Sequence, residues 1–284
     1  MKPAVWQAAR RALLLPAIVI LASTAVPLLL LAQGDLREGI VEFTQLIEKQ
    51  PGNADLYLSR GDLHRSNQDW DRAQADYDYA FRLNPRLEVV EFLRGRLFLE
   101  ANWPFSSKVS LDKFLARQSN HVEALITRAR ALTKLDDRWA ASQDYTRAIQ
   151  LSAAPPIELY LERAQALAGK GGQYVKEALE GLDEGIQKLG PVVTLELAAI
   201  DIEVTQKHYD SALSRIDAVV ARSPRKETWL ARKGEVLRQI GRNEDARAAF
   251  QAALKAVESL PAARRNVPAT LDLQKRVREQ LDSL

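Results

Sequence analysis

Apolar side chains recur every three or four positions along nearly the whole chain from residue 34 onward. This spacing places them on one face of an α-helix, and no stretch alternates apolar and polar residues long enough to predict a β-strand. Polar turns such as SNQD, KLDD and IGRNED separate the periodic stretches. The pattern predicts an all-α fold built from pairs of short amphipathic helices.

The helix pairs repeat with a longer period. Arg60 and Gly61 are followed by Arg94 and Gly95 after 34 residues, by Arg128 and Ala129 after another 34, and by Arg163 and Ala164 after 35. Downstream of each comes a small residue and, four positions later, a bulky one: Ala73 and Tyr77, Ser107 and Leu111, Ala141 and Tyr145, Ala178 and Leu182. One helix pair repeated at a fixed period is the signature of a solenoid.

The N-terminal residues 1–32 follow a different pattern. Lys2, Arg10 and Arg11 precede an apolar run at 12–32 that contains no charged residue. Such a segment is typical of an export signal or a membrane anchor. Because the positive residues stay on the cytoplasmic side, we expect the repeats to lie outside the cytoplasm, in the periplasm. Cleavage of the segment and its retention as an anchor are both open.

The repeated positions resemble the tetratricopeptide repeat family, as found in exported bacterial proteins. Its unit is a 34-residue helix-turn-helix with small, aromatic and proline positions in this order. The best match lies at 54–85, in Tyr57, Gly61, Ala73, Tyr77, Ala80 and Pro85. The resemblance implies a right-handed α-solenoid at 33–260, with a partial repeat at 34–50 and six repeats at 54–259. A capping helix is expected at 261–284.

Two of the recurring arginines predict ion pairs. Asp76 and Asp144 follow Arg60 and Arg128 by 16 residues, each just before an aromatic residue of the second helix. A half-buried guanidinium needs a fixed carboxylate, so one spacing seen twice favours structural pairs. We therefore predict the ion pairs Arg60–Asp76 and Arg128–Asp144.

At Arg94 the same spacing reaches Ser110, with Asp112 nearby. This exception leaves a second interpretation open. The arginines, Arg163 among them, could instead line a groove and hold an acidic ligand.

The resemblance also implies a binding surface, because the first helices of such repeats line a concave groove that receives a peptide or a partner's helix. The matching positions form an apolar column beside a polar one: Leu58, Phe92, Ile126 and Leu161, and Asp62, Arg96, Arg130 and Gln165. Apolar anchors flanked by charge suit an amphipathic or extended peptide. Leu58 and Asp62 stand where chaperone-binding members carry the first Lys and the Asn of a carboxylate clamp, so that mode of binding is not expected.

The composition gives no sign of a catalytic, cofactor or metal site. The 284 residues include no cysteine and only three histidines, none of which share a local motif. We expect no enzyme activity, no cofactor and no metal. The net charge of +3 is no evidence for nucleic-acid binding: apart from Lys2, Arg10 and Arg11, the 37 remaining basic residues equal the 37 acidic ones.

Three hypotheses for the function follow. The first is an exported, non-enzymatic scaffold or adaptor that binds protein partners. The second is a dedicated assembly or maturation factor for an envelope complex or for cytochrome c. The third is a regulatory repeat protein with a cryptic hydrolase activity, which the repeats disfavour because they use nearly every residue after 33. Membrane contact is expected only through an uncleaved N-terminal segment.

Overall fold

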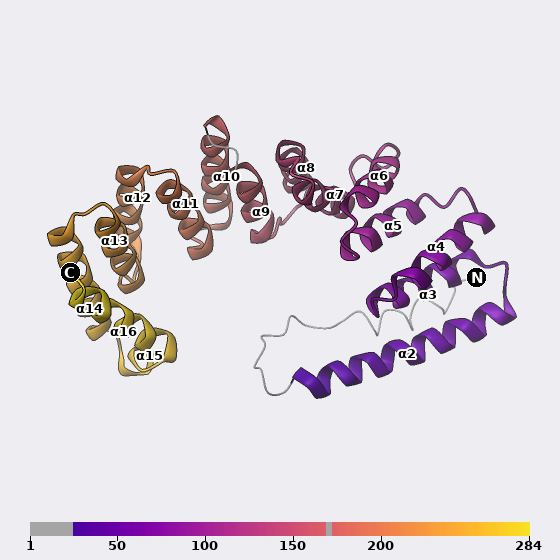
Figure 1. Cartoon of the computed structure of the whole chain (residues 1–284), viewed down its shortest axis with the longest axis horizontal. Helices are drawn as coiled ribbons and strands as arrows, with labels where there is room; N and C mark the ends of the chain where they lie inside the picture. The colour runs from indigo at the N-terminus through magenta and orange to yellow at the C-terminus, as the bar shows by residue number, and fades with distance from the viewer. Residues whose placement is uncertain (1–24, 169–171) are drawn as a thin grey trace. The chain divides into compact units, whose positions relative to one another are not determined.

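The computed structural model describes residues 25–168 and 172–284, and all regular secondary structure in these ranges is α-helical (Figure 1). The predicted all-α solenoid of helical repeats is therefore confirmed. The chain divides into two compact units, the first ending at Phe114 and the second beginning at Leu115.

The first unit consists of one long helix and two helix pairs, α3 with α4 and α5 with α6. The helices are α2 (Ala25–Lys49), α3 (Ala54–Ser66), α4 (Trp70–Leu83), α5 (Val89–Glu100) and α6 (Pro104–Leu115). Helix α2 packs against α3, and its Ile47 joins a small apolar cluster with Leu56 and Tyr57. The expected partial repeat at 34–50 is the C-terminal part of this helix. Because α2 starts at Ala25, it crosses the predicted boundary after residue 32 without a break.

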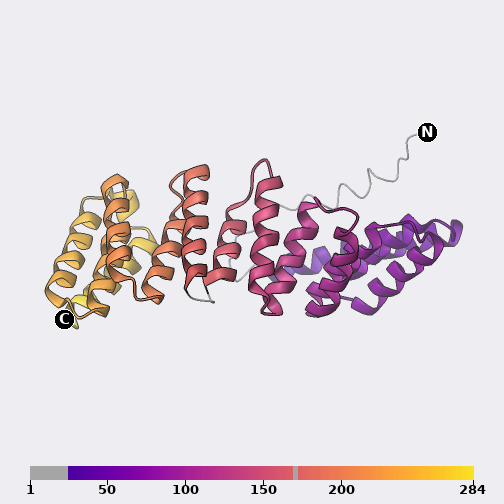
Figure 2. The same cartoon turned by 90° about the horizontal axis from the view of Figure 1, so that it is seen from above.

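The second unit continues with four helix pairs and a C-terminal extension. The helices are α7 (Val122–Lys134), α8 (Arg138–Leu151), α9 (Ile157–Ala168), α10 (Gln173–Leu189), α11 (Val193–Thr205), α12 (Tyr209–Arg222), α13 (Glu227–Gln239), α14 (Asn243–Glu258), α15 (Ala262–Arg265) and α16 (Pro268–Asp282). Within the unit, each second helix contacts the first helix of the next pair, so the pairs stack in chain order (Figure 2). The expected C-terminal helix is α16, which packs against α13 and α14 through the buried Leu273 and Val277.

The turn inside a helix pair uses the same backbone conformation in five of the pairs. Gln68, Asn102, Asp136 and Lys207 have φ angles between 59° and 62°, and Gly241 has 77°. This left-handed conformation stops the first helix and redirects the chain into the second. Four of the five positions carry a residue other than glycine, and Asn102 and Asp136 are of the types that adopt this conformation most readily, so the turn does not depend on a glycine.

Aspartates cap two of the second helices. The carboxylates of Asp69 and Asp137 accept hydrogen bonds from backbone N–H groups at the start of α4 and α8, which satisfies donors that have no partner inside the helix. Asn243 is the first residue of α14, and Arg242 occupies the capping position.

The small residues of the first helices have the packing role that the repeat predicts. A methyl group on Gly61 would lie 2.7 Å from a ring carbon of Tyr77, and one on Gly234 would lie 2.5 Å from a ring carbon of Phe250. Both rings are fully buried. The two helices of these repeats therefore approach so closely that the ring of one fills the space above the glycine of the other.

The N-terminal segment is only partly described. Residues 1–24, on which the export signal or anchor prediction largely rests, lie outside the described residues. Among the residues that are described, no helix combines the length and the hydrophobicity that a membrane span requires.

Candidate functional site

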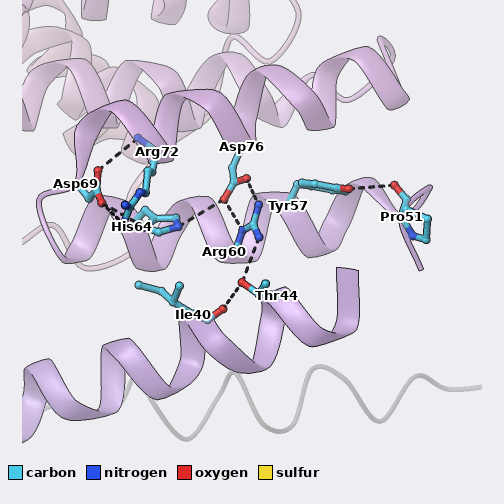
Figure 3. Close-up of polar contacts among 9 residues, drawn as sticks. All are labelled: Ile40, Thr44, Pro51, Tyr57, Arg60, His64, Asp69, Arg72 and Asp76. Carbon is cyan, nitrogen blue, oxygen red and sulfur yellow. Dashed lines mark hydrogen bonds and ion pairs between the residues drawn. The ribbon is translucent and has the colours of Figure 1, made fainter. Parts of the chain in front are cut away.

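The side chain of Arg60 joins three helices of the first unit (Figure 3). Its Nε and Nη2 donate to the two carboxylate oxygens of Asp76 on α4, at 2.9 and 2.6 Å. Its Nη1 donates to Thr44 Oγ1 on α2 at 3.1 Å, and that hydroxyl donates to the carbonyl of Ile40. The carboxylate is almost fully buried. The planar guanidinium thus forms a bidentate pair with the carboxylate, and bidentate pairs are among the strongest hydrogen-bonded ion pairs in proteins.

The second predicted pair has the same geometry in the second unit. Arg128 on α7 donates from Nε and Nη2 to both oxygens of Asp144 on α8, at 2.7 and 2.8 Å. The Asp144 side chain is 8% exposed and the Arg128 side chain 24%. Both arginines therefore hold a carboxylate of their own repeat, which argues against their use for an acidic ligand.

Arg94 does not bond forward in this way. The residue 16 positions on is Ser110, which has no carboxylate, and the nearby Asp112 instead bonds Lys108 at 2.7 Å. Arg94 turns back to Asp78, 16 residues earlier on α4, with N–O distances of 2.6 and 3.1 Å. The pair therefore joins two successive repeats rather than the two helices of one.

Arg163 is the most deeply buried arginine of the set. At the position of the aspartates, just before the bulky Leu182, α10 carries Gly181. The guanidinium occupies the space that a side chain would need there, since a Cβ on Gly181 would lie 2.8 Å from Nη2. Nη2 donates to the Gly181 carbonyl at 2.9 Å and to Glu184 at 2.7 Å. Burial disfavours the charge on Glu184, but Lys188 and Arg163 outweigh this and lower its pKa.

In the α11/α12 pair the positions of the arginine and the carboxylate are reversed between the first and the second helix. The arginine, Arg215, lies on the second helix and bonds Asp183 of α10 at 2.6 Å and the buried Glu203 of α11 at 3.3 Å. Burial raises the pKa of Glu203 although Arg215 acts against it. The three side chains line a shallow cleft between α10 and α12, and their ion pairs hold the two repeats together across it.

Two of the predicted groove charges are partners in internal networks. Asp62 accepts a hydrogen bond from the buried Tyr77 hydroxyl at 2.8 Å and one from Arg65 at 3.1 Å. Arg65 also bonds Glu100 on α5 at 2.6 Å. Burial and the adjacent Asp62 carboxylate raise the pKa of Tyr77. The network ties the first helices α3 and α5 to each other.

Arg130 has an equivalent arrangement in the second unit. It donates to both oxygens of Glu162 on α9, at 2.9 and 2.8 Å, and the Tyr145 hydroxyl donates to the same carboxylate at 2.7 Å. Burial disfavours the charged Glu162, but these bonds outweigh it and lower the pKa of the carboxyl group. A third link of this kind joins Asp201 of α11 and Arg232 of α13.

The apolar column of the predicted groove is only partly accessible. Phe92 is buried against Phe114, with ring centroids 5.4 Å apart, so it belongs to the core. The guanidinium of Arg96 lies over the Phe92 ring. Leu58, Ile126 and Leu161 are half-buried, and Gln165 is exposed. Phe92 was predicted as a groove anchor, but its buried ring has little surface to offer to a partner.

Sequence reasoning missed the acidic residues that complete these networks, namely Asp78, Glu100, Glu162 and Glu184. Their spacings from the arginines are −16, +35, +32 and +21 residues. Only the first repeats the 16-residue interval and could have been found by reading it in both directions. Among the described residues, no group of three or more His, Asp or Glu side chains has the arrangement of a metal site.

Comparisons with known proteins agree with this repeat organisation. A family model described as a tetratricopeptide repeat-like domain matches residues 158–273, and a tetratricopeptide repeat model matches 28–88. No curated protein sequence matches the chain significantly.

Two of the solved structures that are similar in fold illustrate the likeness. One is a tetratricopeptide repeat protein from Parabacteroides merdae, 18% identical, with a TM-score of 0.52 over 87% of this chain and 94% of its own. The other is from the Naa15/Naa10 complex bound to HypK-THB, 17% identical, with a TM-score of 0.52 over 89% of this chain and 44% of its own. The helix pairs, the small-to-bulky contacts between them and the two family matches lead to one conclusion: the chain belongs to the tetratricopeptide repeat family.

Proposed function

We propose that the chain is a non-enzymatic scaffold that binds a protein partner, as a peptide or a helix, along the first helices of its repeats. The observation that carries this proposal is the set of ion pairs between consecutive first helices: Arg65 with Glu100, Arg130 with Glu162, and Arg232 with Asp201. They fix the spacing of these helices from outside the core. A surface that is rigid before binding loses less entropy when a partner docks.

The part of this surface best suited to contact lies on α7 and α9. Ile126 and Leu161 are half-buried aliphatic side chains, and Gln165 is exposed beside them. The charges of Arg130 and Glu162 neutralise each other, which leaves an apolar surface flanked by polar groups. An amphipathic helix or an extended peptide with spaced apolar side chains has the matching chemistry.

Replacing Ile126 and Leu161 together by Glu is expected to weaken partner binding by about tenfold or more, since it puts two charges into an apolar contact. The matched control is Leu151→Glu at the end of α8, where the leucine is already 40% exposed. The measurement is quantitative mass spectrometry of proteins captured by each tagged chain, followed by titration with the enriched partner. Equal loss in the control, or capture unaffected in the double variant, would contradict the proposal.

We infer further that the scaffold works outside the cytoplasm. The support is the order of charged and apolar residues in the segment 1–32, which is that of an export signal or anchor. We expect the chain in an envelope fraction, either beginning near residue 33 or carrying its full N-terminus. Fractionation with N-terminal sequencing measures both, and an intact chain found only in the cytosol would rule out export.

A further inference from the structure

His64 on α3 is a buried titratable group with no part in the binding surface. The residue is 6% exposed, and within the described part of the chain its Nδ1 has no hydrogen-bond partner. Nδ1 lies 3.8 Å from Asp69 Oδ2 and Nε2 lies 4.0 Å from Asp76 Oδ2. Both distances exceed a hydrogen bond, and Figure 3 shows the imidazole between the two carboxylates.

Each of these carboxylates already has a cation of its own. Asp76 is held by two bonds from Arg60, and Asp69 pairs with Arg72 at 3.2 Å. Asp69 also caps α4 by accepting from the backbone N–H of Arg72. A proton on the imidazole would therefore add a positive charge to a cluster of two aspartates and two arginines that is already neutral.

The remaining element that packs here is α2, which contributes the uncharged Thr44 through its bond from Arg60. The charged groups that act on the imidazole are thus Asp69 in the turn, Asp76 and Arg72 on α4, and Arg60 on α3. An imidazolium would compete with Arg60 for Asp76. Because Arg60 also holds Thr44, that competition reaches the contact between α2 and α3.

We propose that His64 is a pH-sensitive switch in the first repeat, and that proton uptake by its imidazole loosens the packing of α2, α3 and α4. The cost arises because a charge in a buried position loses its hydration without gaining an uncommitted partner. Burial lowers the pKa of His64, and the attraction of Asp76 and Asp69 only partly opposes it.

The sign of the effect follows from this direction. An unfolded or open segment holds its histidine at a pKa of about 6.5, above that of the folded state, so the open state binds the proton more tightly. The stability contributed by the neutral imidazole is complete above about pH 6.5 and is lost as the pH falls through the pKa of the folded state. Acidification therefore favours opening of this repeat.

Hydrogen exchange read by mass spectrometry tests the switch on the full chain, kept in solution with a mild detergent. After correction for the intrinsic exchange rate, opening of peptides from α2 to α4 should rise by about threefold or more between about pH 7.5 and about pH 5.5. His64→Gln should remove that dependence, whereas His208→Gln, a change at an exposed histidine in the second unit, should leave it intact. The same pH dependence in all three chains would overturn the proposal.

A second measurement does not depend on a variant that folds. The chain has only three histidines, so the imidazole signals can be followed individually by NMR during a pH titration. We expect the His64 signal to titrate below about 6.5. A value at or above that pKa, or slower exchange in α2 to α4 at the lower pH, would show that the imidazolium is stabilised by Asp69 and Asp76, and the switch would be excluded.

Discussion

Replacing Asp144 by Ala is expected to lower the free energy of unfolding of its repeat by about 3–5 kcal/mol, because the half-buried Arg128 guanidinium would lose both of its bonds to the buried carboxylate. Arg128→Ala should cost at least as much, since it leaves Asp144, the more buried partner, without this bond. The double variant should cost clearly less than the sum of the two single variants, because each single variant already removes the bond between the two residues. Chemical denaturation of the unaltered chain, the two single variants and the double variant completes a double-mutant cycle, which gives the coupling free energy between Arg128 and Asp144.

A surface ion pair in the same repeat provides a control for the double-mutant cycle on Arg128 and Asp144. Arg138 pairs with Asp136 at the surface, where the side chains are 34% and 69% exposed. Arg138→Ala should cost about 1 kcal/mol or less, since exposed pairs are screened by water and salt. Additive effects at Arg128 and Asp144 would mean that the pair is not structural, and the arginines would again be candidates for binding an acidic ligand.

Phe250→Ala should be as damaging at the other end of the second unit, with an expected loss of about 3–5 kcal/mol. The ring is fully buried and fills the space over Gly234, and it belongs to the cluster that includes Leu273 and Val277 of α16. Its removal leaves a cavity that the two helices cannot close, because the glycine offers no side chain to fill it.

Hydrogen exchange shows which helices lose stability in Phe250→Ala. We expect faster opening in α13, α14 and α16 and unchanged protection in α7 and α8, because each repeat contacts only its neighbours. Phe105→Ala is the matched control, since this phenylalanine is 69% exposed on α6 and should change stability by no more than about 0.5 kcal/mol. Equal effects of the two substitutions would show that ring burial at Phe250 does not hold the repeat.

The fold could be predicted from the sequence because each repeat carries a small and a bulky residue at equivalent positions of its two helices. Gly61 and Tyr77 identify two helices that must approach closely, and no other element is needed to explain them. The pair Arg128–Asp144 was predictable for the same reason, since its spacing occurs twice. Local spacing carries this information because both partners belong to one repeat.

The surface was less predictable because its contacts cross from one repeat to the next. Phe92 falls in register with Leu58 and Ile126, but it is buried because Phe114 packs against it. Arg130 was assigned to a partner, whereas Glu162 of the next first helix holds it. Which side chains contact each other between repeats depends on how the helix pairs stack. The 34-residue period of the sequence carries no information about this stacking.

Whether a basic residue of a first helix bonds a carboxylate of its own repeat or of the preceding one affects how the chain responds to salt. Arg60 and Arg128 bond aspartates of their own repeat that are 8% exposed, whereas Arg94 and Lys233 bond Asp78 and Asp217 of the preceding repeat, which are 36% and 55% exposed. Dissolved ions screen exposed charges far more than buried ones. Rising ionic strength is therefore expected to weaken the Arg94–Asp78 and Lys233–Asp217 links between repeats more than the Arg60–Asp76 and Arg128–Asp144 pairs within repeats, which would make unfolding less cooperative from one repeat to the next.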